Sequence, residues 1–340
     1  MNKPWLTLVI CGPCILLAVL ALALAGVLGG YRGIGTAQAQ SVVTCVVGEG
    51  DTCAAGPAHV VALLGEPFVV EIRVEDFVDA DDDGDTLPEG LGGFQFSLGY
   101  DPDVVSVSSV SDPAEVEALF VGSTGRSVMC VEPLFGTSFV GLSCATLGSS
   151  PLGPTGSGVV ARVTFLPGAQ ADVSTELIVS TILADLPGNA QPHIAQGATV
   201  TVLDPLADTD EDGCSNSEEL GPNPDLGGQR DPQNPWDFYD VPVPSHYASG
   251  GGGTRDKAIG MTTDMVALLT YVGSINTGSD PRYNVDLDHD GVQDGIEYDR
   301  RTSAYPSQPW RSGPPDGGIG ITTDVVAMIK QGGHSCTAPP

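Results

Sequence analysis

Basic residues are scarce in this sequence. Its 340 residues include 13 Lys and Arg against 43 Asp and Glu, so the formal net charge is -30 at pH 7. Nucleic-acid binding depends on clusters of Lys and Arg against the phosphates, and the composition therefore argues against a nucleic-acid partner. The acidic excess suits cations instead, because carboxylate oxygens are hard ligands of the kind that calcium prefers.

The motifs of common catalytic sites are also missing. The sequence has no H-E-x-x-H, no G-x-S-x-G and no Walker loop, and its five histidines are scattered. After the first 40 residues there is no C-x-x-C, which leaves zinc ribbons and thioredoxin-like sites without support. Paired carboxylates abound, so the inventory leaves a glycosidase open, but residues 42–203 contain no Trp. The sequence favours a protein that is not an enzyme.

The first 39 residues have the features of an export signal. Lys3 precedes residues 5–28, which carry no charged side chain, and Ala37-Gln38-Ala39 offers a small-x-small cleavage site. An apolar run of about 24 residues is also long enough to cross a bilayer. We interpret residues 1–39 as a signal peptide or an N-terminal membrane anchor, which predicts a secreted or cell-surface protein.

Six cysteines follow this leader. An even number in an exported chain indicates disulfides, although six cysteines can pair in many ways. We favour two disulfides between cysteines that are close in sequence, Cys45–Cys53 and Cys130–Cys144, and one between distant cysteines, Cys214–Cys336.

Residues 42–203 have the pattern of short β-strands. Apolar and polar residues alternate over 68–74, 94–98 and 159–166, and Gly, Pro and Asp fill the gaps. Amphipathic helices, which a βαβ fold would need, are not found, apart from one helical turn expected at 113–120. Many short strands at this spacing predict a sandwich or barrel. Further strands are expected at 104–110, 128–131, 138–145, 177–183 and 198–203.

After residue 204 the sequence becomes rich in Asp, Gly and loops, with four glycines at 250–253 as a flexible joint. Residues 259–264 read Ile-Gly-Met-Thr-Thr-Asp, and residues 319–324 read Ile-Gly-Ile-Thr-Thr-Asp. Thr-Thr-Asp is a good helix start, since these side chains can cap free backbone N–H groups. Apolar residues follow on one face. Because such short helices are marginal alone, the two are expected to pack against each other.

Residues 286–297 carry the strongest motif, Asp-Leu-Asp-His-Asp-Gly-Val-Gln-Asp-Gly-Ile-Glu. This is the spacing of a twelve-residue EF-hand calcium loop. Alternate residues of a tight loop point to one centre, the Gly permits positive φ, and the last Glu can bind through both oxygens. The expected ligands are Asp286, Asp288, Asp290, the backbone carbonyl of Val292, Asp294 and Glu297.

Residues 208–219 repeat this spacing as Asp-Thr-Asp-Glu-Asp-Gly-Cys-Ser-Asn-Ser-Glu-Glu. Asn at position 9 lowers the charge but keeps an oxygen. The alternative for both loops is an acidic surface turn, and the regular spacing argues against it. A third acidic run, at 79–85, has Gly90 where Glu is needed and is better read as a solvated loop. The expected Ca²⁺ ligands of this loop are Asp208, Asp210, Asp212, Cys214 through its carbonyl, Asn216 and Glu219.

Both loops resemble bacterial thrombospondin type 3 repeats. In the first, the Asp-x-Asp-x-Asp-Gly loop and its Glu are followed at 230–237 by Arg-Asp-Pro-Gln-Asn-Pro-Trp-Asp, similar to the Asp-Pro-x-Asn-Pro segment of that family. The resemblance covers about 204–240 and 286–310, and it implies that Asp231 and Asn234 border the calcium region.

The β region resembles a cohesin-like domain. Residues 92–105 (Gly-Gly-Phe-Gln-Phe-Ser-Leu-Gly-Tyr-Asp-Pro-Asp-Val-Val) and 158–165 (Gly-Val-Val-Ala-Arg-Val-Thr-Phe) carry the resemblance. It implies a jelly-roll sandwich related to some carbohydrate-binding modules, and a protein-binding face, because cohesins bind dockerins. The two Thr-Thr-Asp helices are similar to dockerin halves, although the Asp spacing is one residue too long and the earlier ligands are missing.

The sequence thus predicts a mainly β fold, a cohesin-like jelly-roll β-sandwich followed by a small loop-rich calcium-binding α segment. The expected function is that of an exported, non-catalytic calcium-binding surface protein acting as a protein-interaction or scaffold module. A carbohydrate-binding protein linked to extracellular polysaccharide is the alternative, so the partner is a protein or a surface glycan. The expected domains are 1–39 (leader or anchor), 42–203 (sandwich), 204–240 (first calcium repeat), 241–285 (linker and first dockerin-like helix) and 286–340 (second repeat and helix).

Overall fold

The computed structural model describes residues 42–53, 56–78, 90–111, 120–148, 151–243, 255–286, 291–303 and 308–336. The predicted leader, the acidic run at 79–85, the glycine joint at 250–253 and most of the helical turn expected at 113–120 lie outside these ranges. Within them, no helix combines the length and the apolar character that a membrane crossing requires.

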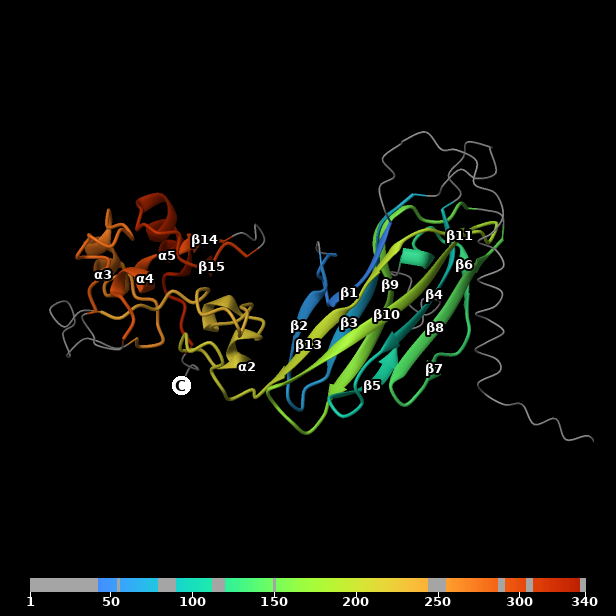
Figure 1. Cartoon of the computed structure of the whole chain (residues 1–340). Coiled ribbons are helices and arrows are strands. Elements are labelled where there is room, and N and C mark those ends of the chain that lie inside the picture. Colours follow the sequence, from blue (N-terminus) through green and yellow to red (C-terminus); the bar gives the residue numbers. More distant parts are fainter. Residues whose placement is uncertain are drawn as a thin grey trace, which may run out of the picture. The chain divides into compact units, whose positions relative to one another are not determined.

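Residues 42–203 form a sandwich of two β-sheets (Figure 1). Neighbouring strands are mostly antiparallel, but β1 runs parallel to β12 and β2 runs parallel to β13. One sheet has the order β12 (Ile194–Gln196), β1 (Val43–Gly48), β3 (Phe68–Phe77), β9 (Gly156–Pro167) and β5 (Val105–Val110). The other has the order β2 (Ala58–Leu63), β13 (Ala198–Leu203), β10 (Val173–Asp185), β4 (Leu91–Gly99), β8 (Phe139–Leu147) and β6 (Ser127–Cys130), with β11 (Ala190–Gln191) beside β10 and β7 (Leu134–Phe135) beside β8.

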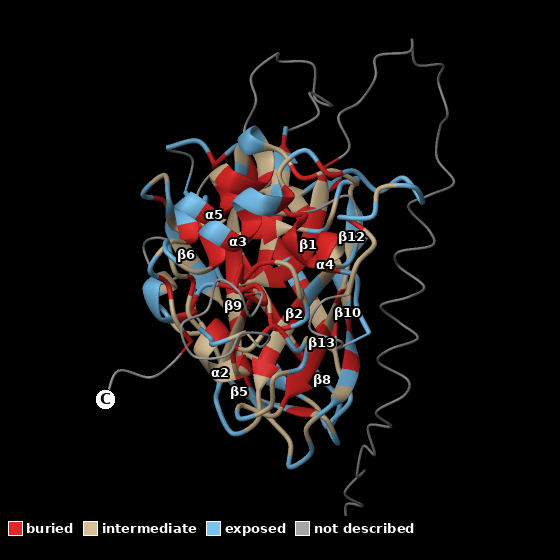
Figure 2. Ribbon diagram, turned by 90° about the vertical axis from the view of Figure 1, so that its left-hand side faces the viewer, coloured by how far each residue is buried: buried red, intermediate tan, exposed pale blue. Residues whose placement is uncertain are grey.

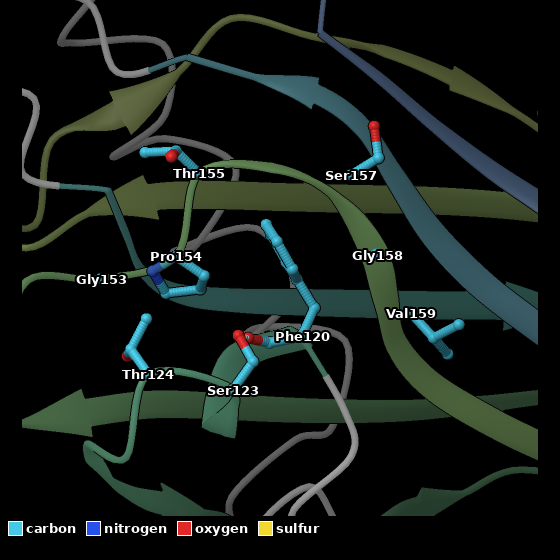
Figure 3. A pocket seen from close by; sticks show the side chains of 9 residues that line it. All are labelled: Phe120, Ser123, Thr124, Gly153, Pro154, Thr155, Ser157, Gly158 and Val159. Carbon is cyan, nitrogen blue, oxygen red and sulfur yellow. Dashed lines mark hydrogen bonds between the residues drawn. The ribbon is translucent and has the colours of Figure 1, made fainter.

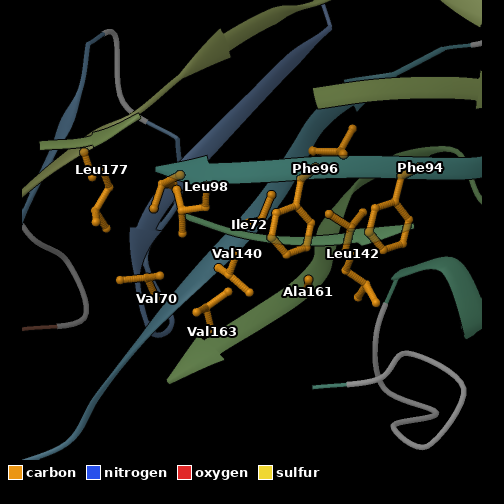
Figure 4. Packing of buried hydrophobic residues seen from close by; sticks show 14 of the residues in the cluster. Val70, Ile72, Phe94, Phe96, Leu98, Val140, Leu142, Ala161, Val163 and Leu177 are labelled. Atoms are coloured by element: carbon orange, nitrogen blue, oxygen red, sulfur yellow. The ribbon is translucent and has the colours of Figure 1, made fainter. Parts of the chain in front are cut away.

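The core of the sandwich lies between the two sheets. Strand β4 turns Phe94, Phe96 and Leu98 inward and Gln95 and Ser97 outward, as period-2 alternation requires. Apolar side chains of β3 and β9, in the other sheet, lie opposite Phe94 and Phe96, and Val140 and Leu142 of β8 lie beside these rings in the same sheet (Figure 4). Every strand expected from the sequence is present, and most extend further than expected.

Strand β1 was not among those expected, and burial explains why. Four consecutive residues of β1, Thr44 to Val47, are buried, so the alternation that marks a half-exposed strand is lost. Strands β2, β7, β11 and β12 were also not expected. Strand β13, which was expected, is buried at five of its six residues (Figure 2). The three expected disulfides, Cys45–Cys53, Cys130–Cys144 and Cys214–Cys336, are all present.

Residues 204–336 form a second, loop-rich unit with its own core. Its buried side chains include Phe238, Tyr239, Tyr298 and Met328. Its elements are short: α2 (Asn216–Glu219), η2 (Pro224–Leu226), α3 (Asp264–Tyr271), α4 (Asp294–Tyr298), β14 (Arg301–Thr302), β15 (Ser312–Gly313), the π-helical turn η3 (Ile321–Val325) and α5 (Val326–Gln331).

The two repeated Thr-Thr-Asp segments are interlocked. The Ile259 N–H donates to the carbonyl of His334, and the Ile319 N–H donates to the carbonyl of Ser274. Each repeat therefore pairs, just before its helix, with the chain that follows the other helix. The helices share one hydrophobic core, which confirms the expected packing.

The expected capping role of the Thr-Thr-Asp segments is wrong for α3. Thr263, its N-cap residue, makes no side-chain capping bond. The Asp264 carboxylate instead accepts hydrogen bonds from the backbone N–H groups of Gly260 (2.7 Å) and Val241 (3.2 Å). Asp264 Oδ2 is thus bound by the nearby chain, whereas Oδ1 is bound by a distant segment, a contact that local sequence does not reveal.

Replacing Phe96 by Ala should destabilise the sandwich by about 3–5 kcal/mol, because the ring is 1 % exposed and its loss leaves a cavity between the sheets. Urea unfolding of the purified protein measures this change. Phe135→Ala is the matched control, since that ring is 54 % exposed, and it should cost less than about 1 kcal/mol. Equal effects of the two variants would contradict the described core.

Candidate metal centre

The loop 208–219 folds through hydrogen bonds that use one oxygen of each aspartate. The Gly213 N–H donates to Asp208 Oδ2 (3.0 Å), the Asp212 N–H to Asp210 Oδ1 (3.2 Å) and the Cys214 N–H to Asp212 Oδ1 (2.9 Å). Gly213, at position 6, has φ 110°, a conformation that favours glycine. The second oxygen of each aspartate is left available to a central ion.

Helix α2 forms the last four residues of the loop and places Glu219 in the same region. The Ser215 N–H, at the helix start, donates to Glu218 Oε2 (2.8 Å). This bond fixes the first turn and turns Glu218 back over the helix start. Glu219, the next residue, is fully buried. The last position of the loop therefore faces inward, as the twelve-residue spacing predicts.

Asp237 joins this group from outside the loop, and the sequence analysis missed it. Its Oδ2 accepts hydrogen bonds from the Asp231 N–H (3.0 Å) and from Arg311 Nε (3.1 Å). The buried Arg230 guanidinium donates to the Asp237 carbonyl (3.0 Å) and holds the segment in place. The one signal for Asp237 in the sequence is its position as the acidic residue that ends the Arg-Asp-Pro-Gln-Asn-Pro-Trp-Asp segment.

Five carboxylates converge on one buried region. Carboxylate oxygens of Asp208, Asp210 and Asp212 lie within 4.8 Å of one another, and so do those of Asp212, Glu219 and Asp237. Six of their oxygens are buried and have no hydrogen-bond partner among the described residues: Asp208 Oδ1, Asp210 Oδ2, Asp212 Oδ2, Glu219 Oε1 and Oε2, and Asp237 Oδ1. Buried polar atoms are almost always paired in folded proteins, so this set calls for a ligand.

The electrostatics of the site also favour a bound cation. Burial, reinforced by the neighbouring carboxylates, raises the pKa of Asp210, Asp212 and Asp237 to about 7. The same causes raise the pKa of Glu219 to about 10. Without a cation these groups favour their neutral forms, whereas a bound divalent ion would favour the charged forms.

The donor set fits calcium. All donors are oxygens, which excludes a structural zinc site of the usual Cys and His type. Glu219 leaves both carboxylate oxygens available, as bidentate binding requires, and the six oxygens match the six to eight that calcium takes. Cys214, at position 7, would add its carbonyl. The Asn216 side chain is buried, where its Oδ1 accepts from the Thr209 N–H (3.2 Å), and its part as a ligand stays a prediction.

The second loop is described only in part. Asp288 and Asp290 lie outside the described residues. Asp286 Oδ2 accepts from the Gly291 N–H (3.2 Å), the same bond that joins positions 1 and 6 of the first loop. At the other end Glu297 Oε1 pairs with Arg255 (3.2 Å). Of the remaining expected ligands, Asp294 accepts from the Tyr271 hydroxyl (2.6 Å) and Val292 is 41 % exposed. Calcium here stays a prediction.

The sandwich has a hollow of a different character. It has a volume of about 510 Å³ and lies beside Phe120 (Figure 3). Its described lining carries no acidic, basic or histidine side chain, so the lining offers neither metal ligands nor an acid–base pair. The other lining residues are Ser123, Thr124, Gly153, Pro154, Thr155, Ser157, Gly158 and Val159.

No family model and no curated protein matches the chain. Its structure is similar to solved cohesins. The solution structure of CaCohA2 from Clostridium acetobutylicum is 15% identical, the match covers 48% of this chain and 91% of that chain, and the TM-score is 0.34. A non-cellulosomal cohesin from Archaeoglobus fulgidus is 16% identical over 48% of this chain and 91% of that one, with a TM-score of 0.33. A type I cohesin–dockerin complex from Clostridium thermocellum matches at 12% identity over 51% and 99%, with a TM-score of 0.36. At these identities the likeness concerns fold alone, and it covers about half of this chain.

Asp237→Asn should weaken calcium binding by about tenfold or more, because it removes one negative charge from the buried ligand set. Titration calorimetry on the intact protein measures the affinity. Asp231→Asn is the matched control, since its side chain is 42% exposed, pairs with Arg311 at 3.9 Å and accepts the Gln233 N–H (3.2 Å). Unchanged affinity in Asp237→Asn would remove this residue from the site.

The raised carboxyl pKa values also predict how pH acts on the protein in EDTA. A group whose pKa is raised by folding stabilises the fold at low pH, and that contribution is lost as pH rises through the raised pKa. Because three of these pKa values are about 7, the melting temperature of the calcium-free 204–336 unit should fall between pH 6 and pH 8. In saturating calcium this fall should disappear. A melting temperature that rises with pH in EDTA would contradict the assignment.

Proposed function

We propose that this chain is an exported, non-catalytic calcium-binding protein whose sandwich is a protein-interaction module. The observation that carries the calcium assignment is the set of six buried carboxylate oxygens without hydrogen-bond partners among the described residues. The three disulfides fit an oxidising compartment outside the cytoplasm.

The burial of the ligands supports a structural role for calcium. Asp212, Glu219 and Asp237 are each 0% exposed, so a substrate could not reach an ion that they hold. A catalytic metal needs an open coordination position. The calcium ion would therefore stabilise the fold and take no part in a reaction.

The calcium loop is connected to the interlocked helices by several contacts. Cys214 forms a disulfide with Cys336, at the end of the helix pair. Arg230 donates both to Gln331 Oε1 (3.3 Å) and to His334 Nδ1 (3.0 Å). An ion in the loop would thus stabilise the whole 204–336 unit, beyond its own twelve residues.

The sandwich offers an apolar surface suited to a protein partner. On the outside of the β10-β4-β8-β6 sheet, Ile178 lies in register with Gly99 and Phe139, and Met129 lies opposite Ala145. Exposed apolar residues that gather on one face mark interaction sites more often than scattered ones do. We call this surface the outer face, and its exposed large apolar residues are Met129, Val131, Leu134, Phe139, Leu147, Ile178 and Ile182.

The composition of the outer face favours a protein over a glycan. Aliphatic side chains dominate it together with Met129, and Met is among the residues enriched at protein interfaces. Sugar sites usually offer exposed aromatic platforms, whereas Phe139 is the one aromatic residue of this set. Phe135, which is also exposed, lies in register with the inward-facing Val140. In the 204–336 unit Trp236 is covered on one side by Arg300, whose guanidinium lies 4.4 Å from the ring centroid.

A binding experiment with two matched variants tests the proposed interaction. Immobilised wild-type protein and the variants Phe139→Asp and Ile194→Asp are incubated with culture supernatant in calcium, and the retained molecules are identified. We expect Phe139→Asp to lose a protein that wild type retains. Ile194, on β12 of the other sheet, is similarly exposed at 51%, and its variant should retain that protein. Retention of polysaccharide alone, or equal binding by all three, would contradict a protein-binding outer face.

A further inference from the structure

Arg230 is a buried cation beside the candidate metal centre, and its guanidinium is fully hydrogen-bonded. The residue is 3% exposed. A guanidinium has five N–H donors, and here it has five acceptors, none of which is a carboxylate. They are the carbonyls of Asp237 (3.0 Å), Pro224 (3.1 Å) and Gly228 (3.3 Å), Gln331 Oε1 (3.3 Å) and His334 Nδ1 (3.0 Å).

His334 can accept this hydrogen bond only as a neutral ring. An arginine N–H always donates, so Nδ1 of His334 must present its lone pair, and the ring proton is then on Nε2. Nε2 lies 3.4 Å from Oδ1 of Asp225, whose side chain is 76% exposed. Arg230 and Asp225 are the charged groups that act on the ring, and His334 itself is 8% exposed.

Protonation of the ring would disrupt this arrangement. A proton on Nδ1 would remove the acceptor and would place an imidazolium N–H against the guanidinium in a buried region. Burial and the charge of Arg230 lower the pKa of His334, and Asp225 opposes them only in part. The stability that the neutral ring contributes is therefore present above about pH 6.5, the usual value for histidine, and is lost as the pH falls below it.

Arg230 connects this ring to the candidate metal centre. Its Nε binds the carbonyl of Asp237, and its backbone N–H donates to the carbonyl of Glu219 (2.9 Å). Both of these residues contribute unpaired carboxylate oxygens to the centre. The carbonyl of His334 accepts from the Ile259 N–H (2.9 Å), which precedes α3. A change at the ring would thus act on the metal centre and on the interlocked helices.

We infer that His334 is a pH-sensitive switch that controls how tightly the 204–336 unit binds calcium. The neutral ring keeps Arg230 in contact with the segments that carry Glu219 and Asp237. The protonated ring releases Arg230, and these carboxylates are then held less firmly. The inference rests on the proposed calcium site and adds to it a regulation by mild acid.

Calcium affinities at pH 7.5 and pH 5.5 test this inference. Titration calorimetry on the intact protein compares wild type with His334→Asn, whose amide oxygen can replace Nδ1 as an acceptor but does not take up a proton. Both proteins should bind calcium less tightly at pH 5.5, because protons compete for the ligand carboxylates. We expect the loss of affinity to be about threefold or more larger in wild type. His59→Asn, a histidine change in the sandwich, should behave like wild type.

Equal losses of affinity in wild type and His334→Asn would overturn the inference. If His334→Asn fails to fold, Asp225→Asn takes its place. This change removes the negative charge that favours the protonated ring, so the loss of affinity should occur at a lower pH than in wild type. A pH profile identical to that of wild type would then overturn the inference. Absence of calcium binding by wild type at pH 7.5 would instead contradict the proposed function itself.

Discussion

The fold of the C-terminal unit depends on the compensation of buried negative charge. Asp212, Glu219 and Asp237 are fully buried, and each keeps at least one oxygen that forms no hydrogen bond within the described structure. Removing carboxylates from water costs several kcal/mol each unless a partner of opposite charge is present. The calcium ion that we propose would convert this repulsion into attraction, and the acidic residues would then stabilise the fold.

The same constraint accounts for the way the loop is built. Each of the first three aspartates uses one oxygen to accept a backbone N–H, which shapes the turn, and keeps the other for the centre. Contacts with the remainder of the unit stabilise this arrangement. Arg230 binds the carbonyl of Asp237, and the disulfide from Cys214 extends the support to the end of the chain. The proposed metal site and the packed helices are thus linked by direct contacts.

How much of this could be predicted depended on distance along the chain. The carboxylates of the first loop follow a local spacing, and the strands β3, β4 and β9 follow a local alternation. The sequence therefore predicted the strands and the convergence of these carboxylates. Asp237 lies 18 residues after Glu219 in the numbering and enters the site through a turn that only the folded chain defines. The role of Asp264 was misread for the same reason, since its partner is the N–H of Val241. Strand β1 escaped detection because burial of consecutive residues removes the alternation.

Hydrogen exchange tests the dependence of the fold on calcium most directly. The amides of Gly213 and Cys214 donate to the loop aspartates, whereas those of β4 donate within the sandwich. At pH 7.5 we expect EDTA to abolish the protection of the loop amides and of α3 and α5, while the protection of β4 remains as it is in millimolar calcium. Equal protection of the loop amides with and without calcium would show that these carboxylates are accommodated without an ion.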